Sequence, residues 1–480
     1  MAAASLLAGC ASGVRQPDLT LPQAYEAPAG DVQLPPAALD TWWTIFADDG
    51  LNALEDEALR NSPDARTQIA RLQEAGATRS STILQTFMPT GQLTGSASRK
   101  QTADLGSNAD SFLPVGGRSE NEALNFNVSW ELDFLGALRT ARQAARADFA
   151  VTRFQVEAAR ASLVANVADS YFQARGLAIQ LADANQTVRI QSELLRVATV
   201  KATHGLGPPA DADRIAGDLA QARSQVESLE AELHVAQRLL LILVGRGPDR
   251  VETLPVVADV PNPPPVPEAV PGELLARRPD VRQAEFQMRS AVLKTKLAKE
   301  QIFPNLVLQP ALGYARAVAP GVALLPGGGF GLQQQTTTTG FWSYGIGMTQ
   351  PVLDIPRMLQ DAKAQGARAE QAVIAYEKAV QTAYGDAESA LVRLSADERR
   401  IRLLEDGEAR ARRAYEAARI GYTSGINDLT TALSAEQSWR TDRTALTAQR
   451  VQALRRAVQT YKALGGGWAY AAEQTPVRTP

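Results

Sequence analysis

The sequence predicts a mainly α-helical protein that also carries β-strands, built from two copies of one unit. Three observations support this fold class. Segments of the chain recur at an offset of about 216 to 220 residues, two proline-free helical stretches each run for about 60 residues, and apolar and polar residues alternate in short segments between them. Each unit has the order helix, strand, strand, long helix, return helix. The two-faced strands are of the kind that forms a membrane β-barrel.

Composition excludes several classes of function. The 480 residues contain 49 Lys and Arg against 52 Asp and Glu, so a basic surface for nucleic acid is not expected. A single cysteine and two histidines exclude a disulfide framework and leave little for metal binding or histidine-driven catalysis. We therefore expect no enzyme, no metal and no cofactor. The longest apolar run after the N-terminus, 239–244, is far shorter than the ~18 residues of a membrane-spanning helix.

The N-terminus is expected to be lipidated. Leu7-Ala8-Gly9-Cys10 is similar to a bacterial lipobox, in which the cysteine becomes the acylated first residue of the mature protein. Each CH₂ of such a chain contributes about 0.8 kcal/mol in a bilayer. Residues 1–9 are then the remnant of a signal peptide. No Lys or Arg precedes Cys10, which leaves open a start codon upstream of Met1.

The internal repeat defines the domain organisation. Residues 59–66 align with 275–282, 87–89 with 302–304, and 203–206 with 423–426. Between the copies lies a proline-rich segment that cannot hold a helix. The predicted segments are a lipidated coil (10–47), repeat 1 (48–246), a linker (247–271), repeat 2 (272–464) and a C-terminal tail (465–480).

Each repeat is expected to begin with a helix and continue with two strands. In repeat 1 the helix begins at Ser62-Pro63-Asp64, where Ser is a good N-cap and Pro suits the first helical position, and it runs to about Gln85. The predicted strands are 90–102 and 123–134 in repeat 1, and 305–318 and 340–353 in repeat 2, where a Gly- and Thr-rich loop separates them.

Strands of ~12 residues are long enough to cross an outer membrane, which needs about 9–11. Four strands cannot close a barrel, and lipid does not tolerate open sheet edges. If these strands enter the membrane, each chain must therefore contribute part of a shared barrel.

Two long helices follow the strands, each with a return helix. The predicted ranges are 139–200 and 211–244 in repeat 1, and 357–421 and 428–464 in repeat 2. In the first return helix, apolar or small residues from Leu219 to Leu243 alternate spacings of three and four, which is typical of a coiled coil. The turns between the paired helices are expected at Gly205 and Gly425.

The ordered set of these features resembles the outer-membrane channel proteins of tripartite efflux pumps, the TolC and OprM kind, including lipoproteins of the NodT type. The resemblance depends on Leu275 to Val281, on the Phe-Pro pair before a first strand, and on the turn from Tyr422 to Leu429, within a duplicated order of elements. It covers the chain from about Trp42 onward. It implies a homotrimer with a twelve-stranded barrel in the outer membrane of a Gram-negative bacterium and a helical tunnel in the periplasm. A periplasmic adaptor and an inner-membrane RND pump are the implied partners.

The resemblance also implies roles for residues at the helix turns. The adaptor-contact positions are His204, Gly205 and Leu206 in the first turn, and Ser424, Gly425 and Ile426 in the second. The tunnel gate of the family often carries two aspartates in an Asp-x-x-Asp-Ala arrangement, and here these positions are Thr431 and Ser434. Asp428 and Asp211 are the nearest acidic residues, and each is as well suited to be the N-cap of its return helix.

The function expected from these features is passive export of small molecules across the outer membrane. A type I protein-secretion channel shares this fold and remains an alternative. A soluble structural coiled-coil protein is a second alternative, of another class, in which the strands would form an ordinary sandwich. The exported substrate, the pump and the adaptor cannot be derived from the residues.

Overall fold

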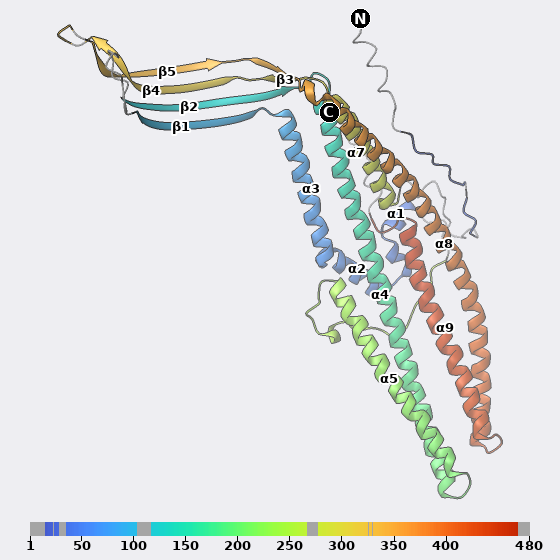
Figure 1. The fold of residues 1–480 in the computed structure, drawn as a ribbon. Helices are drawn as coiled ribbons and strands as arrows, with labels where there is room; N and C mark the ends of the chain where they lie inside the picture. Colours follow the sequence, from blue (N-terminus) through green and yellow to red (C-terminus); the bar gives the residue numbers. More distant parts are fainter. Residues whose placement is uncertain are drawn as a thin grey trace. The chain divides into compact units, whose positions relative to one another are not determined.

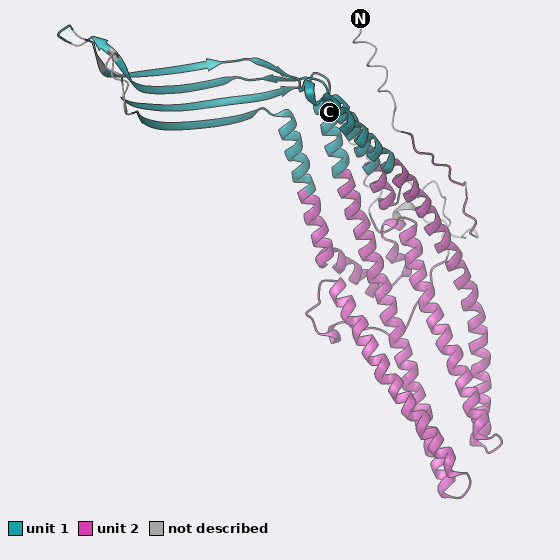
Figure 2. Ribbon diagram, viewed as in Figure 1, with its two compact units in different colours: residues 1–15, 75–149, 287–372 teal, residues 16–74, 150–286, 373–480 magenta. Residues whose placement is uncertain are grey.

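The structure, a computed structural model, describes residues 15–22, 24–27, 35–102, 117–265, 277–324, 326–328 and 330–468. Helices predominate in these ranges, and the strands form one antiparallel sheet (Figure 1). The chain divides into two compact units (Figure 2). Unit 1 comprises 1–15, 75–149 and 287–372, and unit 2 comprises 16–74, 150–286 and 373–480. Cys10 lies outside the described residues.

From α3 in repeat 1 and from α7 in repeat 2, the order is the same: a helix, strands, a long helix and a return helix, with each of the two strands of repeat 2 divided into two segments. Repeat 1 has α2 (Asp49–Asn61), α3 (Pro63–Phe87), β1 (Thr90–Thr102), β2 (Gly117–Leu132), α4 (Ala137–Thr203) and α5 (Pro209–Leu243). Repeat 2 has α7 (Pro279–Glu300), β3 (Asn305–Leu308), β4 (Ala311–Leu324), β5 (Phe330–Ser343), β6 (Ile346–Thr349), α8 (Ile355–Thr423) and α9 (Leu429–Ala463). The four long helices differ by no more than three residues at either end from the predicted ranges. None of the helices in the described ranges combines the length and apolar character that crossing a membrane requires.

The prediction that residues 10–47 form a coil is wrong for the last part of this range. Residues 36–40 form a short helix, α1 (Pro36–Asp40), and η2 (Trp42–Phe46) is a 3₁₀ turn. Trp42 is fully buried, and its ring stacks on Tyr461 of α9 with centroids 5.8 Å apart. Two tryptophans and a phenylalanine within five residues supply enough apolar surface to fold this segment onto the helices, in spite of the prolines before it.

The sheet lies within unit 1, and all its strand pairs are antiparallel. β1 pairs along its whole length with β2, from Thr90 opposite Ser129 to Thr102 opposite Gly117. The other edge of β2 pairs with β4 and, near its end, with β3. β4 then pairs with β5, and β3 with β6. β1 and β5 each leave one edge without a partner strand in the described part of the chain.

The strands of repeat 2 differ from the prediction. The first extends to Leu324 and is interrupted after Leu308, because Pro310 has no N–H for the ladder, although its carbonyl accepts a hydrogen bond from Val128 N (2.9 Å). The second strand begins at Phe330, ten residues before the predicted position, and is interrupted after Ser343. The expected loop contains four consecutive threonines, Thr336–Thr339. Threonine favours strands, and these residues pair with β4.

The main hydrophobic core lies in unit 2. It joins the N-terminal turn and α2 to one face of α4 and of α9, with residues such as Phe46, Leu51, Phe172 and Leu454 almost fully buried. The proline-rich linker is not wholly exposed, because Val251 and Leu254 are part of this core. The core therefore fixes α4 against α9, which belong to different repeats.

Each return helix ends against the residues just before α3 or α7, the helix that precedes the strands of its own repeat. A Cβ atom at Gly245, just after α5, would lie 2.6 Å from the carbonyl oxygen of Asn61. One at Gly465, just after α9, would lie 3.0 Å from the carbonyl carbon of Arg277, and Trp468 Nε1 donates to the Arg277 carbonyl (2.9 Å). Only glycine allows these close approaches, so the end of each return helix packs directly on the segment just before α3 or α7.

Candidate functional site

The sheet has one apolar and one polar face. On β2 the apolar residues are those at even positions from Leu124 to Leu132, and the residues between them are polar. The strand register brings apolar residues of β1, β4 and β5 to the same face. We call this set the apolar band: Leu93, Leu124, Phe126, Val128, Trp130, Leu132, Leu312, Tyr314 and Trp342. Most of these side chains are exposed in the chain, with Leu93 at 66% and Trp342 at 76%.

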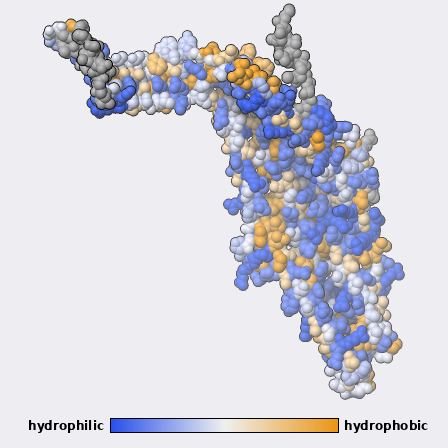
Figure 3. Space-filling view, in the orientation of Figure 1, coloured by the Kyte–Doolittle hydropathy of each residue, from blue (hydrophilic) through white to orange (hydrophobic). Residues whose placement is uncertain are grey.

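The width of the apolar band matches a bilayer. The stretch from Leu124 to Leu132 covers nine residues, or about 30 Å at ~3.3 Å per residue, and a strand tilted by about 40° would span roughly 23 Å of membrane. The lipid-facing band of outer-membrane barrels is about 25 Å tall. Figure 3 shows hydrophobic side chains (orange) gathered along the strands on the side where the helices of unit 1 begin.

The two helix turns have the same backbone geometry. In the first, Gly205 N donates to the Ala202 carbonyl (3.1 Å) and Leu206 N to that of Lys201 (2.8 Å). In the second, Gly425 N donates to Tyr422 (3.2 Å) and Ile426 N to Gly421 (2.8 Å). Both glycines have positive φ, +71° and +76°. This is the Schellman motif, and the sequence repeat has therefore produced the same helix end twice.

An apolar side chain is exposed at each turn. The residue after the glycine in a Schellman motif usually packs back on its helix. Here Leu206 is 78% and Ile426 81% exposed. These two residues, at equivalent positions of the repeats, give each turn a small apolar surface for another molecule.

The predicted gate residues lie on an exposed face of α9. Asp428 caps this helix, with Oδ1 accepting a hydrogen bond from Thr431 N (2.8 Å), and the Thr431 side chain and amide lower the pKa of its carboxyl. The Ser434 hydroxyl donates to the Thr431 carbonyl (3.1 Å). All three side chains are exposed in the chain, while Leu429 and Leu433 face the interior. The carboxylate is therefore both a helix cap and a fixed negative charge.

Asp211 has a different position. It lies in the first turn of α5, whose N-cap residue is Pro208, so the capping role that the sequence allowed for both aspartates belongs only to Asp428. Instead, burial and the negative charge of the Asp211 carboxylate together raise the pKa of Tyr422. In the first turn, His204 Nδ1 lies 2.9 Å from the Val200 carbonyl, and within the described ranges no three His, Cys, Asp or Glu residues are grouped so that they could hold a metal ion.

Tyr422 joins the two helix pairs near the turns, a role that the sequence analysis missed. The centroid of its ring lies 4.0 Å from Lys201 Nζ of α4. The side chain also belongs to a hydrophobic cluster with residues of α4, α5 and α9. The cluster consists of Leu194, Ala198, Ile215, Tyr422, Leu429, Ala432 and Leu433. An aromatic residue three positions before the turn glycine is the only signal in the sequence, because cation–π pairing between helices leaves no periodic pattern.

Ion pairs along α9 continue this connection. Arg455 forms a two-pronged pair with Asp169 of α4 (2.8 and 2.9 Å), and Arg443 pairs with Asp183 (2.5 Å). Toward α8, Arg450 pairs with Glu405 and Arg456 with the buried Asp397, both at 2.7 Å. Burial raises the pKa of Asp183 despite the adjacent arginine. These partly buried pairs fix the register of α9 between α4 and α8, and they contribute less to the free energy of unfolding.

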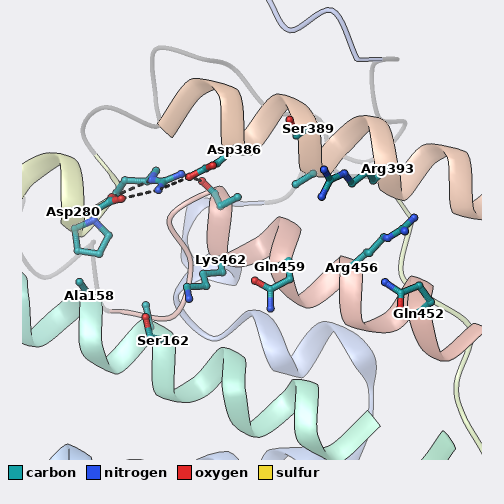
Figure 4. Close-up of a pocket in the computed structure, with 15 residues that line it drawn as sticks. Ala158, Ser162, Asp280, Asp386, Ser389, Arg393, Gln452, Arg456, Gln459 and Lys462 are labelled. Atoms are coloured by element: carbon teal, nitrogen blue, oxygen red, sulfur yellow. Dashed lines mark hydrogen bonds and ion pairs between the residues drawn. The ribbon is translucent and has the colours of Figure 1, made fainter. Parts of the chain in front are cut away.

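A polar groove of about 670 Å³ lies between α4, α8 and α9 (Figure 4). Arg278 spans its end: it donates to Asp280 (2.6 Å), Asp386 (3.2 Å) and the carbonyl of Ala463, the last residue of α9 (3.4 Å). The same guanidinium therefore holds the end of α9, the start of α7 and the middle of α8. The corresponding residue of repeat 1 is Ser62, so this tie exists in one repeat only.

Comparison with known proteins identifies the class. The model of the outer membrane efflux protein family matches residues 54–246 and 270–466, which is most of the chain. The protein belongs to this family, and it is the outer-membrane duct of an efflux system. The alternative of a soluble structural coiled-coil protein is therefore wrong.

Individual relatives cover almost all of the chain. The pyoverdine export outer membrane protein OpmQ of Pseudomonas aeruginosa is 25% identical over 432 residues, 89% of this chain and 87% of its own. The toluene efflux pump outer membrane protein TtgC of Pseudomonas putida is 26% identical over 502 residues, 99% of this chain and 97% of its own. The solved structure of the outer-membrane channel OprN superposes with a TM-score of 0.77 and 26% identity, covering 95% of this chain and 99% of the other. These relatives support the helical tunnel and β-barrel fold.

The turn glycines allow a test with an internal control. Gly425→Ala should destabilise the protein by about 1–2 kcal/mol, because a Cβ atom is disfavoured at φ +76° although no neighbouring atom crowds it. Gly385→Ala, in the interior of α8 and equally uncrowded, should stabilise it by up to about 1 kcal/mol. Thermal melting in detergent measures both changes in stability. If both variants shift the melting temperature in the same direction, the assignment of Gly425 to a left-handed turn position is contradicted.

Proposed function

We propose that the protein works as a homotrimeric, passive export duct whose helical part lies in the periplasm. The observation that carries this proposal is the sheet, which has an exposed apolar band of bilayer width and, among the described residues, one unpaired edge on each of β1 and β5. Unpaired backbone groups are very unfavourable in lipid. Edge-to-edge pairing of β1 with β5 of the next copy removes them. When β3–β4 and β5–β6 are each counted as one interrupted strand, a chain has four strands and three copies supply twelve.

We further propose that the two turns contact a periplasmic adaptor that connects the duct to an inner-membrane RND pump. Leu206 and Ile426 are the exposed apolar residues of the turns, and they flank backbone segments without side-chain bulk at Gly205 and Gly425. Because the two turns present similar small apolar surfaces, a partner with two similar binding surfaces can contact both turns in the same way. The relatives are named for pyoverdine and toluene export, so we propose small molecules as cargo without assigning one.

Adaptor contact predicts a specific loss of export. The double change Leu206→Asp and Ile426→Asp should reduce efflux of a fluorescent dye at least tenfold in cells that depend on this duct, because burying two carboxylates at an interface is unfavourable. Cross-linking in mild detergent should still give a trimer. The matched control is Val235→Asp with Leu403→Asp, two exposed apolar residues away from the turns. Equal losses in both double variants would refute turn-specific docking.

Lipidation of Cys10 is proposed from the lipobox resemblance alone. Cys10→Ser should abolish incorporation of labelled palmitate in growing cells, because the thiol is the acceptor. The trimer should remain in the membrane, since a closed barrel anchors it without a lipid chain. Label that persists in the variant would show that Cys10 is not the modified residue.

We propose that Asp428, Thr431 and Ser434 line the narrow end of the duct, where three copies of Asp428 would form an acidic ring. Such a ring favours cations. Asp428→Asn keeps the helix cap and removes the charge, so cation preference should fall while the trimer stays intact. Since the pKa of Asp428 is lowered, the preference of the parent should persist to a lower pH than for an ordinary aspartate.

Single-channel recordings in a planar bilayer measure this preference. Asp213→Asn, an exposed aspartate of α5, is the control with the same change of charge. Thr431→Val should alter conductance and leave selectivity unchanged. If Asp428→Asn conducts cations and anions as the parent does, the gate lies elsewhere.

A further inference from the structure

The face of the sheet that carries the apolar band also carries a row of charged residues. Continuing along β2 from Leu124 toward the β1–β2 hairpin, the same-face residues are Glu122, Glu120 and Arg118. The register places Arg99 of β1 opposite Glu120 and Arg316 of β4 opposite Glu122. We call these five residues the charged row. It adjoins the apolar band on β2 and β4, while on β1 the small residues Gly95 and Ala97 lie between Leu93 and Arg99 on the same face.

Contacts within the charged row hold the arginines in place without using all their donors. Arg118 Nε donates to Glu120 Oε1 (2.7 Å), and Arg99 Nε lies 3.7 Å from the same oxygen. Arg316 Nη1 donates to Glu122 Oε2 (3.4 Å). The arginine side chains remain 43–62% exposed. A guanidinium has five N–H donors, so each arginine keeps donors for an external acceptor, and the row has a net charge of +1.

The position of the charged row relative to a bilayer follows from the apolar band. The row begins at Glu122, two residues or about 7 Å along the strand beyond Leu124. Since the apolar band accounts for the whole hydrocarbon thickness, the row lies at the level of the lipid headgroups. Charged side chains on a lipid-facing strand are strongly disfavoured at the midplane and tolerated at the interface.

We propose that the charged row binds phosphate groups of phosphorylated lipid headgroups. Arginine presents a planar pair of donors that matches phosphate, and three of them along about two strand spacings can engage more than one phosphate of a headgroup. The two glutamates orient the guanidinium groups and prevent excess positive charge when no lipid is bound. This inference depends on the proposed periplasmic placement of the helices, which puts the β1–β2 hairpin end, and so the row, in the outer leaflet.

The test uses the full-length chain reconstituted in nanodiscs of phosphatidylcholine in which roughly one lipid in ten is diphosphorylated lipid A. Native mass spectrometry after release from the nanodisc measures retained lipid. The parent should retain lipid A in preference to phosphatidylcholine. The triple variant Arg99→Gln, Arg118→Gln, Arg316→Gln should lose this preference by about tenfold or more.

Lys100 provides the matched control. It neighbours Arg99 on β1 but projects to the polar face of the sheet, so Lys100→Gln should leave lipid retention unchanged. A parent that inserts as a trimer and shows no preference for lipid A would overturn the inference, as would an equal loss in Lys100→Gln. Failure of the parent to enter nanodiscs would instead count against the proposed function, which keeps the two outcomes separate.

Discussion

The pairing of backbone hydrogen-bonding groups in the sheet is the constraint on which the rest of the structure depends. One edge of β1 and one of β5 have no partner strand in the described part of the chain, while the apolar band faces outward. Water could satisfy such edges, but lipid cannot. A chain with these strands is stable in a membrane only when copies of it close the sheet. The proposed homotrimer meets that requirement, because β1 of one copy can pair with β5 of the next.

The helices need no partner strand, because their backbone hydrogen bonds form within each helix. Their arrangement is decided by side chains: the core around Trp42 and Tyr461, the ion pairs of Arg443 and Arg455, and the Tyr422 cluster near the turns. Ties of α9 to both α4 and α8 place it between two helices of different repeats. Polar ties of this kind are individually weak and directional, so they select one register of the helices more than they add to the stability of the fold.

The fold and the two turns were predictable from the sequence to a large degree. Helix periodicity and the missing prolines predicted the long helices to within three residues, and Gly205 and Gly425 predicted both Schellman turns, because these are local properties of the chain. Asp428 was identified as a possible cap, and it is one. The N-terminal turn at Trp42 and the first ten residues of β5, 330–339, were not predicted, since burial against distant residues decides the first and pairing with β4 the second.

By itself the sequence determined the duplicated unit, the two-faced strands and the positions of the turns, since each depends on residues close together in the chain. Only the tertiary structure decided which residues of different strands share a face. The charged row exists because the register brings Arg99 and Arg316, 217 positions apart, beside Glu120 and Glu122. In the same way, packing between the repeats brings Tyr422 to Lys201, and packing within repeat 2 brings Arg278 to Ala463, 185 positions further along the chain. Contacts between distant residues leave no periodic signal in one sequence, because they are set by how complementary surfaces pack.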